Sequence, residues 1–581
     1  MGHHHGPHGH HHHDHDHEAE ARPLPAAMDP AVPDSELSPD QLSRRGMLRR
    51  AGLLGAGAAT ASVLGTAAAA AATPAGRGEG RGNGNGNGNG NGRGNGGGRR
   101  LHWLAGDHHI HTQYSPDAMY RVADQVGNGA RYGLDWMVIT DHGNVNHSRI
   151  GVERVNPDIR SARETYRDTL VFQGLEWNIP AAEHATVFVH PGRNEVSVLK
   201  QFETDYDGGV RGATDSSPRN EALAIAGLDF LAEQVRRRRV DDALMLANHP
   251  SRKGIDSPHE IRAWRDAQPR IAVGFEGAPG HQAAGIPSPH GPGSGRGYYT
   301  SSPNAHSYPG YPAESYRTWG GFDWMTATVG GLWDSLLSEG KPWWITANSD
   351  SHSNYGDTSA RPQGSDYNAN GYHGDPVYAG AGLNLSAGDF WPGQYSRTHV
   401  GAHDFSYAAV MDGIRDGRIW VDHGGLISGL DAQLRGGNRS ATLGGTLHVR
   451  RGTQVELVLE IALANGPNWA QFVPTLSRVD VIRGAVTGQA SDRDTMRAPE
   501  TKVVKSFDVN ESTGMVTLTY RLGRVDRPCY VRVRGTDGNR SQPGLYGADV
   551  DPAGPALDVL GDADPWLDLW FYSNPIWVLP E

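Results

Sequence analysis

The stretch "GDHHIHTQYSPD" at residues 106–117 holds three histidines within four positions and ends in Asp117. The residues before it, "RRLHWLA", are typical of the start of a short strand. Residues i and i+2 of a strand share a face, so His109 and His111 direct their imidazoles toward one point, whereas His108 points away. The pair predicts the first two ligands of a metal site. One such pair is a weak signal, and the hypothesis therefore requires further ligands elsewhere in the chain.

Five further apolar runs have the composition of buried strands and carry a histidine or an acidic residue at one end. They are "GLDWMVITDHGNV" (133–145), "TLVFQGLEWNI" (169–179), "EHATVFVHPG" (183–192), "DDALMLANHPSR" (241–252) and "KPWWITANSDSHS" (341–353). Helix-like segments lie between them, as at 118–132 and 222–239. This alternation predicts a parallel β/α barrel with polar side chains at the carboxyl ends of its strands.

The polar groups at these strand ends are of types that bind transition metals. A single histidine or aspartate at a strand end is usually a cap or a solvated group, but a whole set in one domain favours a shared site. Neutral imidazoles together with carboxylates suit zinc, iron or manganese, whereas magnesium and calcium prefer oxygen ligands throughout. The sequence therefore predicts a centre of several divalent ions, with His109 and His111 as its first ligands.

Six motifs in a fixed order carry a family resemblance. They are "DHHIHTQYSPD", "ITDHG", "GLEWN", "EHATVF", "ANHPS" and "NSDSH". Taken together they resemble the PHP (polymerase and histidinol phosphatase) family of metal-dependent phosphoesterases, over about residues 101–425. The resemblance implies a distorted (β/α)7 TIM-like barrel over 101–426, with up to three metal ions at the carboxyl ends of its strands.

The resemblance also implies three groups of metal ligands that share members. His109, His111, Glu176 and Asp350 bind the first ion; Glu176 bridges to a second ion, held also by His184 and His249; Asp117, His142 and His352 bind the third. Pro116 separates the serine of the first motif from Asp117, which departs from the family's pattern. His184 is favoured over His190, which flanks the same strand and is followed by proline. Asp141 is expected to orient a ligand rather than to bind metal.

The function implied by the resemblance is hydrolysis of phosphate mono- or diesters of small molecules by a hydroxide that two or three zinc, manganese or iron ions activate. Asp350 or His352 would handle the proton. Arg252 and Lys253 follow His249 and either neutralise a substrate phosphate or form a solvated basic turn. Two alternatives are an amidohydrolase-like enzyme that cleaves C–N or C–O bonds and a non-catalytic exported metal-binding protein. The complete ligand set and the bridging Glu176 favour the phosphoesterase.

Two further regions after residue 276 lie outside the six motifs. The long Gly-, Pro- and Tyr-rich insertion at 277–321 contains Tyr298, Tyr299 and Trp319, which either wall a substrate pocket or belong to an ordinary surface loop. Short runs of alternating apolar and polar residues, separated by Gly, Asn and Asp, predict an antiparallel β-sandwich over 427–581. The sandwich carries no ligand cluster, so we expect a structural or binding role.

The first hundred residues are not expected to belong to the fold. Residues 1–17 are rich in histidine and are either a native metal-buffering tail or a tag. Arg44 and Arg45 precede a weakly hydrophobic Ala- and Gly-rich stretch that ends at Ala72, and this resembles a twin-arginine signal peptide. Residues 1–72 are thus assigned to export by the twin-arginine machinery, giving a secreted or extracytoplasmic protein. Residues 73–100 form a Gly/Asn-rich linker that cannot bury a core.

Composition excludes some partners. The net charge of −12 argues against a nucleic-acid-binding surface. The sequence after residue 100 has no apolar run of 18 residues or more, so no membrane span is expected there. Cys529 is the only cysteine, so no disulfide can form within the chain.

Overall fold

The computed structural model divides the chain into Met1–Gly96 and Gly97–Glu581. It describes residues 101–280, 303–316, 318, 321–353, 361–377, 390–468, 473–537 and 569–581. The His-rich tail, the expected signal peptide and the expected linker lie outside the described residues, as do Tyr298, Tyr299 and Trp319. Among the helices of the described part, none is both long and apolar enough to cross a membrane.

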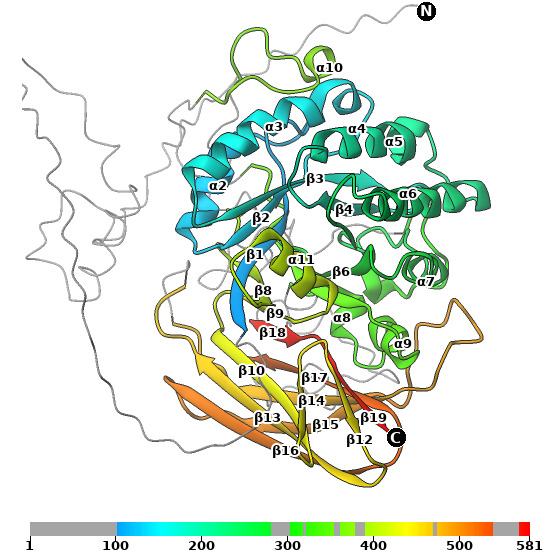
Figure 1. Cartoon of the computed structure of the whole chain (residues 1–581), viewed down its shortest axis with the longest axis vertical. Helices are drawn as coiled ribbons and strands as arrows, with labels where there is room; N and C mark the ends of the chain where they lie inside the picture. Colours follow the sequence, from blue (N-terminus) through cyan, green and yellow to red (C-terminus); the bar gives the residue numbers. More distant parts are fainter. Residues whose placement is uncertain are drawn as a thin grey trace, which may run out of the picture. The chain divides into compact units, whose positions relative to one another are not determined.

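Seven strands form the sheet that carries the histidine motifs (Figure 1). They are β1 (His102–Ile110), β2 (Trp136–Ile139), β3 (Leu170–Asn178), β4 (His184–Val189), β5 (Ala243–Ala247), β6 (Ala272–Ala278) and β7 (Trp344–Ala347), and they neighbour one another in this order. The pairs β1–β2, β2–β3, β5–β6 and β6–β7 are parallel. These strands are buried along nearly their whole length, as is typical of parallel strands covered on both faces.

The prediction of an entirely parallel sheet was wrong at β4, which runs antiparallel to both β3 and β5. Only residues 179–183 connect β3 to β4. A parallel pair requires a crossover of a dozen or more residues, and this short connection therefore forces a hairpin. As a result, the first residue of β4 lies at the same edge of the sheet as the last residues of its neighbours.

Helices occupy most of the connections between these strands. They are α2 (Val122–Arg131), α3 (His147–Thr165), α4 (Glu195–Tyr206), α5 (Gly208–Arg211), α6 (Pro218–Arg236), α7 (Pro258–Ala267), α8 (Trp324–Ala327) and α9 (Leu332–Ser338), with a 3-10 turn at Ala313–Tyr316. The helices expected at 118–132 and 222–239 correspond to α2 and α6. The α7 helix begins with a capping box, because Ser257 accepts from the Glu260 amide and Glu260 accepts from the Ser257 amide.

Two antiparallel strands extend the sheet on the other side of β1. They are β8 (Ser396–Ala402) and β9 (Ile419–His423), separated by α11 (Tyr407–Arg415). The strand at the opposite end of the sheet, β7, contacts β8 and the end of β1. The Thr398 hydroxyl donates to the Ala347 carbonyl at 2.6 Å, and one parallel bridge joins Ile110 to Ser351. The end of β7 is thereby brought beside the end of β1.

The C-terminal region contains a separate four-stranded antiparallel sheet of order β11-β10-β13-β16. Its strands are β10 (Ile427–Gly436), β11 (Arg439–Thr442), β13 (Thr453–Leu463) and β16 (Met515–Val525). The alternating sequence of β13 gives alternately buried and partly exposed side chains, as predicted. Apolar residues of this sheet and of the neighbouring strands share one core, which includes Leu434, Leu457, Val481 and Val531.

The remaining C-terminal strands belong to the large sheet rather than to a self-contained sandwich. They are β12 (Thr446–Val449), β14 (Arg478–Ala485), β15 (Lys502–Asp508), β17 (Cys529–Thr536), β18 (Trp570–Ser573) and β19 (Ile576–Pro580). The pairing of β18 with β9 makes this layer continuous with the strands that carry the histidine motifs. Alternation identifies the two faces of each strand but leaves its edge partner undetermined, so this continuity was not foreseen.

Candidate metal centre

The end of β1 supplies two imidazoles that meet. The Nε2 atoms of His109 and His111 lie 2.9 Å apart, and both side chains are fully buried. His108 points to the other side of the strand, where its ring contacts the hydroxyls of Thr186 and Thr346 at 3.2 and 2.7 Å. The strand periodicity therefore separates His108 from His109 and His111 as expected.

Glu176, near the end of β3, is surrounded by imidazoles. Its Oε1 atom lies 3.0 Å from His184 Nδ1, 3.1 Å from His249 Nε2 and 3.1 Å from His109 Nε2, and its Oε2 atom lies 2.6 Å from His142 Nδ1. Burial alone would raise the pKa of this carboxyl, but His184, His109 and His142 outweigh it and hold the pKa well below its ordinary value. Glu176 is therefore a carboxylate anion, and its two oxygens face different histidines.

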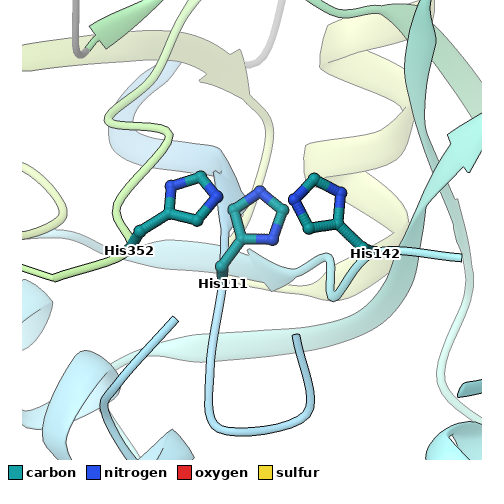
Figure 2. A group of neighbouring side chains, drawn as sticks. All are labelled: His111, His142 and His352. Atoms are coloured by element: carbon teal, nitrogen blue, oxygen red, sulfur yellow. The ribbon is translucent and has the colours of Figure 1, made fainter. Parts of the chain in front are cut away.

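The turn after β7 brings in the last motif. Asp350 Oδ1 lies 3.1 Å from His109 Nε2 and 3.2 Å from His111 Nε2. The His352 ring stacks on His111 with a centroid distance of 3.9 Å, and the His142 ring lies 4.3 Å from His111 and 5.7 Å from His352 (Figure 2). Three imidazoles from three different segments of the chain thus form a compact group.

Asp117 lies at the edge of this group of imidazoles. Its side chain is more than half exposed, and its oxygens lie 3.4 Å from His142 Nε2 and 3.7 Å from His352 Nε2. Although partial burial opposes it, the positive field of His352 and His142 lowers the pKa of Asp117. The residue is near the third expected group of ligands, with looser contacts than the buried members.

The structure distinguishes the two histidines of β4. His184, at the start of the strand, contacts Glu176, whereas His190 follows the far end and bonds the carbonyl of Pro191. The antiparallel direction of β4 explains why the residue that begins this strand is the one brought to the centre.

Arg252 and Lys253 both pair with a carboxylate next to His184. Arg252 Nη2 and Lys253 Nζ lie 2.8 and 3.0 Å from Glu183 Oε1. Glu183 is buried, whereas both cations are partly exposed. The two positive charges are therefore tethered beside the histidine cluster rather than spread in a solvated turn.

Two carboxylates orient the ligand candidates. Glu276, in β6, lies 2.6 Å from His109 Nδ1 and accepts from the His249 amide at 2.5 Å. The Ser115 hydroxyl donates to Asp141, which leaves its oxygen to accept from His111 Nδ1–H at 2.9 Å. In both cases the protonated nitrogen faces away from the cluster, so the Nε2 lone pair is directed into it.

Sequence reasoning assigned the orienting role to Asp141 but missed Glu276. A signal was present, because "GFEG" at 274–277 repeats the Gly-x-Glu order of "GLE" at 174–176. Each glutamate follows a glycine by two positions in a buried strand of the same sheet. That repetition could have indicated that both glutamates lie at the same edge of the sheet.

Backbone strain is concentrated at the centre. Four described non-glycine residues have a positive φ angle, and two of them are His249 at 30° and Asp350 at 47°. Such conformations are uncommon for residues other than glycine and gather at functional sites, where the surrounding structure maintains them.

Burial lowers the pKa of His249 to about 3, with Arg252 adding to the effect, so its imidazole is neutral and able to bind a metal.

The donor set fits divalent transition-metal ions. Within the described residues four groups place their ligand atoms within 4.8 Å of one another: His111–His142–His352, His109–Glu176–His249, His109–His111–Asp350 and His142–Glu176–His184. Ligands about 2.0–2.2 Å from one tetrahedral ion lie about 3.3–3.6 Å apart, near the separations seen here. Mixed nitrogen and oxygen donors suit zinc, manganese or iron. Glu176 belongs to two of these groups, and its two carboxylate oxygens allow it to bind two neighbouring ions.

Comparison with known proteins places a family domain over this part of the chain. The PHP domain model matches residues 107–246. The chain is similar to a two-domain protein containing a predicted PHP-like metal-dependent phosphoesterase from Bacteroides vulgatus, at 13% identity over 76% of this chain and 95% of that one, with a TM-score of 0.30. It is also similar to a candidate metal-dependent phosphoesterase from Bifidobacterium adolescentis, at 15% identity over 30% of this chain and 77% of that one, with a TM-score of 0.18. No curated protein matches the chain.

Proposed function

We propose that this protein is a metal-dependent phosphoesterase that hydrolyses phosphate mono- or diesters at a centre of two to three divalent ions. The observation that carries the proposal is the sharing of Glu176 between two groups of donors, His109–Glu176–His249 and His142–Glu176–His184. A carboxylate placed between two clusters of imidazole nitrogens is the arrangement that a pair of neighbouring ions requires. The match of the PHP domain model to residues 107–246 supports the same class of enzyme.

The ligands of each ion follow the family resemblance, and the structure brings the members of each set close together. His109, His111, Asp350 and Glu176 would hold one ion; Glu176, His184 and His249 a second; and Asp117, His142 and His352 a third. When bound, such ions lower the pKa of a water molecule and neutralise the charge that develops on the phosphoryl oxygens.

The chain's own residues would complete the chemistry. Asp350 lies at the junction of His109 and His111, and His352 lies beside it, with His352 Nδ1 2.8 Å from the Asp350 carbonyl oxygen. Either residue is placed to take up a proton during hydrolysis. Arg252 and Lys253 would receive the anionic substrate, and Glu183 would restrict their positions in advance.

We expect the purified protein to retain two to three zinc, manganese or iron ions per chain and to hydrolyse model phosphate esters. Elemental analysis measures the first property, and assays with p-nitrophenyl phosphate and bis-p-nitrophenyl phosphate measure the second. Carboxylic esters and amides serve as controls, since they lack the several phosphoryl oxygens that a group of ions would bind. Fewer than one ion per chain, or carboxylic-ester or amide turnover that exceeds phosphoester turnover and survives His142→Ala, contradicts the proposal.

We also propose that residues 1–72 direct export by the twin-arginine pathway, on the basis of Arg44, Arg45 and the Ala- and Gly-rich stretch after them. Changing both arginines to lysine is expected to reduce secretion sharply, because lysine presents a point charge in place of the planar guanidinium. The measurement is the ratio of mature to precursor protein in fractionated cells of a host with this pathway. Unchanged secretion of the double variant would point to another exporter.

A further inference from the structure

Two loops carry the outer ligand candidates, and one segment of the chain contacts both. The Asp117 loop comprises residues 113–119, and the His142 loop comprises residues 142–147. The segment 361–377 includes the short helix α10 (Tyr367–Asn370). It follows the last histidine motif in sequence, and its hydrogen bonds return it to loops that lie more than 200 residues earlier.

The Asp117 loop is bound through its backbone carbonyls. The Tyr367 hydroxyl donates to the Tyr114 carbonyl at 3.1 Å, His373 Nε2 donates to the Pro116 carbonyl at 2.8 Å, and Arg361 donates to the carbonyls of Ala118 and Met119. The His373 amide also donates to the Gln113 carbonyl. Residues on both sides of Asp117 are therefore attached to segment 361–377.

The same tyrosine reaches the His142 loop. Asn144 Nδ2 donates to the Tyr367 hydroxyl at 3.0 Å and to the His142 carbonyl at 3.2 Å. The Tyr367 side chain is buried, and burial raises the pKa of its hydroxyl, which therefore keeps the proton it donates. One oxygen atom thus accepts from one ligand-bearing loop and donates to the other.

We propose that Tyr367 is a positioning residue that couples the Asp117 and His142 loops and so sets the affinity of the Asp117–His142–His352 group for its ion. The inference rests on the proposed metal centre but not on the chemistry of the substrate. Asp117 and His142 lie 3.4 Å apart, and both are partly exposed, unlike the fully buried His109 and His111. Their relative position depends on contacts from outside the sheet, and Tyr367 joins the two loops directly.

Tyr367→Phe removes one oxygen atom, and Tyr311→Phe is a matched control. Tyr311 has the same exposed fraction, 7%, and its hydroxyl donates to the carbonyl of Asp256, away from both loops. Hydrogen exchange is measured first in protein stripped of metal by a chelator. We expect the amides of the Asp117 and His142 loops to exchange faster in Tyr367→Phe, and at the wild-type rate in Tyr311→Phe.

Manganese or zinc affinity is then measured by competition with a chelator. Tyr367→Phe is expected to weaken the binding of one ion by about 10–100-fold and to leave the affinity for the others unchanged, as is usual for residues that orient ligands. Tyr311→Phe should leave all of them unchanged. Wild-type exchange in both loops, or full affinity for every ion in Tyr367→Phe, would overturn the inference. Absence of phosphoesterase activity in the wild type would overturn the proposed function and leave these two results standing.

Discussion

Glu176→Gln is expected to lower kcat/KM for a phosphate ester by about 10³-fold and to reduce the number of bound ions. The substitution keeps the shape of the side chain but replaces a carboxylate, whose oxygens face His109, His142, His184 and His249, with a neutral amide. Charge stabilisation by a metal ion contributes several kcal/mol, and each factor of ten in rate corresponds to about 1.4 kcal/mol. Steady-state kinetics and elemental analysis of the same preparation measure both effects.

Two comparisons separate this effect from a general loss of structure. Glu195→Gln changes another buried glutamate, which lies in α4 and pairs with Arg163 of α3 at 2.9 Å. None of the described hydrogen bonds or ion pairs of Glu195 involves a residue of the centre, so this variant should keep full activity. Asp141→Asn should cost only about 10–100-fold, because Asp141 acts on His111 through Ser115. Equal losses in Glu176→Gln and Asp141→Asn would mean that Glu176 does not bridge ions.

Asp334→Ala is expected to lower the free energy of unfolding by about 3–5 kcal/mol, the typical cost of leaving a buried charge without its partner. Asp334, in α9, accepts from Arg532 Nε at 2.9 Å and from Arg532 Nη2 at 2.6 Å, and neither side chain is exposed. The Tyr530 hydroxyl also donates to Asp334, and the Arg532 guanidinium lies 4.5 Å from the centre of the Trp333 ring. Urea denaturation followed by fluorescence measures the change.

Asp266→Ala provides the control for this prediction. Asp266 also joins the two regions of the described chain, through Arg493 at 2.9 Å, but its side chain is 24% exposed. Ion pairs that water reaches contribute at most about 1 kcal/mol each, so this variant, which also loses the pairs with Lys341 and Arg265, should cost clearly less than Asp334→Ala. A loss below about 1 kcal/mol in Asp334→Ala would show that the ion pair does not hold α9 against β17.

The sequence by itself determined the membership of the cluster to a large extent. The alternation of strand side chains separates His108 from His109 and His111, and apolar runs ending in polar residues identify Glu176, His249, Asp350 and His352 as neighbours at one edge of a sheet. These inferences depend on periodicity and on the direction of single strands, which are local properties. The alternation in the C-terminal region likewise identified short half-buried strands there, because such a strand must present one apolar face, but it did not show that only four of them form a sheet of their own.

Tertiary structure alone decided how these elements pair and what supports the site. The reversal of β4 explains why His184, which the sequence favoured over His190, is the neighbour of Glu176, and the pairing of β18 with β9 joins the C-terminal layer to the first sheet. The Tyr367 hydroxyl lies 3.1 Å from the carbonyl of Tyr114, although 252 residues separate them in the chain. Strand pairing and such hydrogen bonds depend on which surfaces meet when the chain folds, and that information is spread over residues too distant for any local pattern to express.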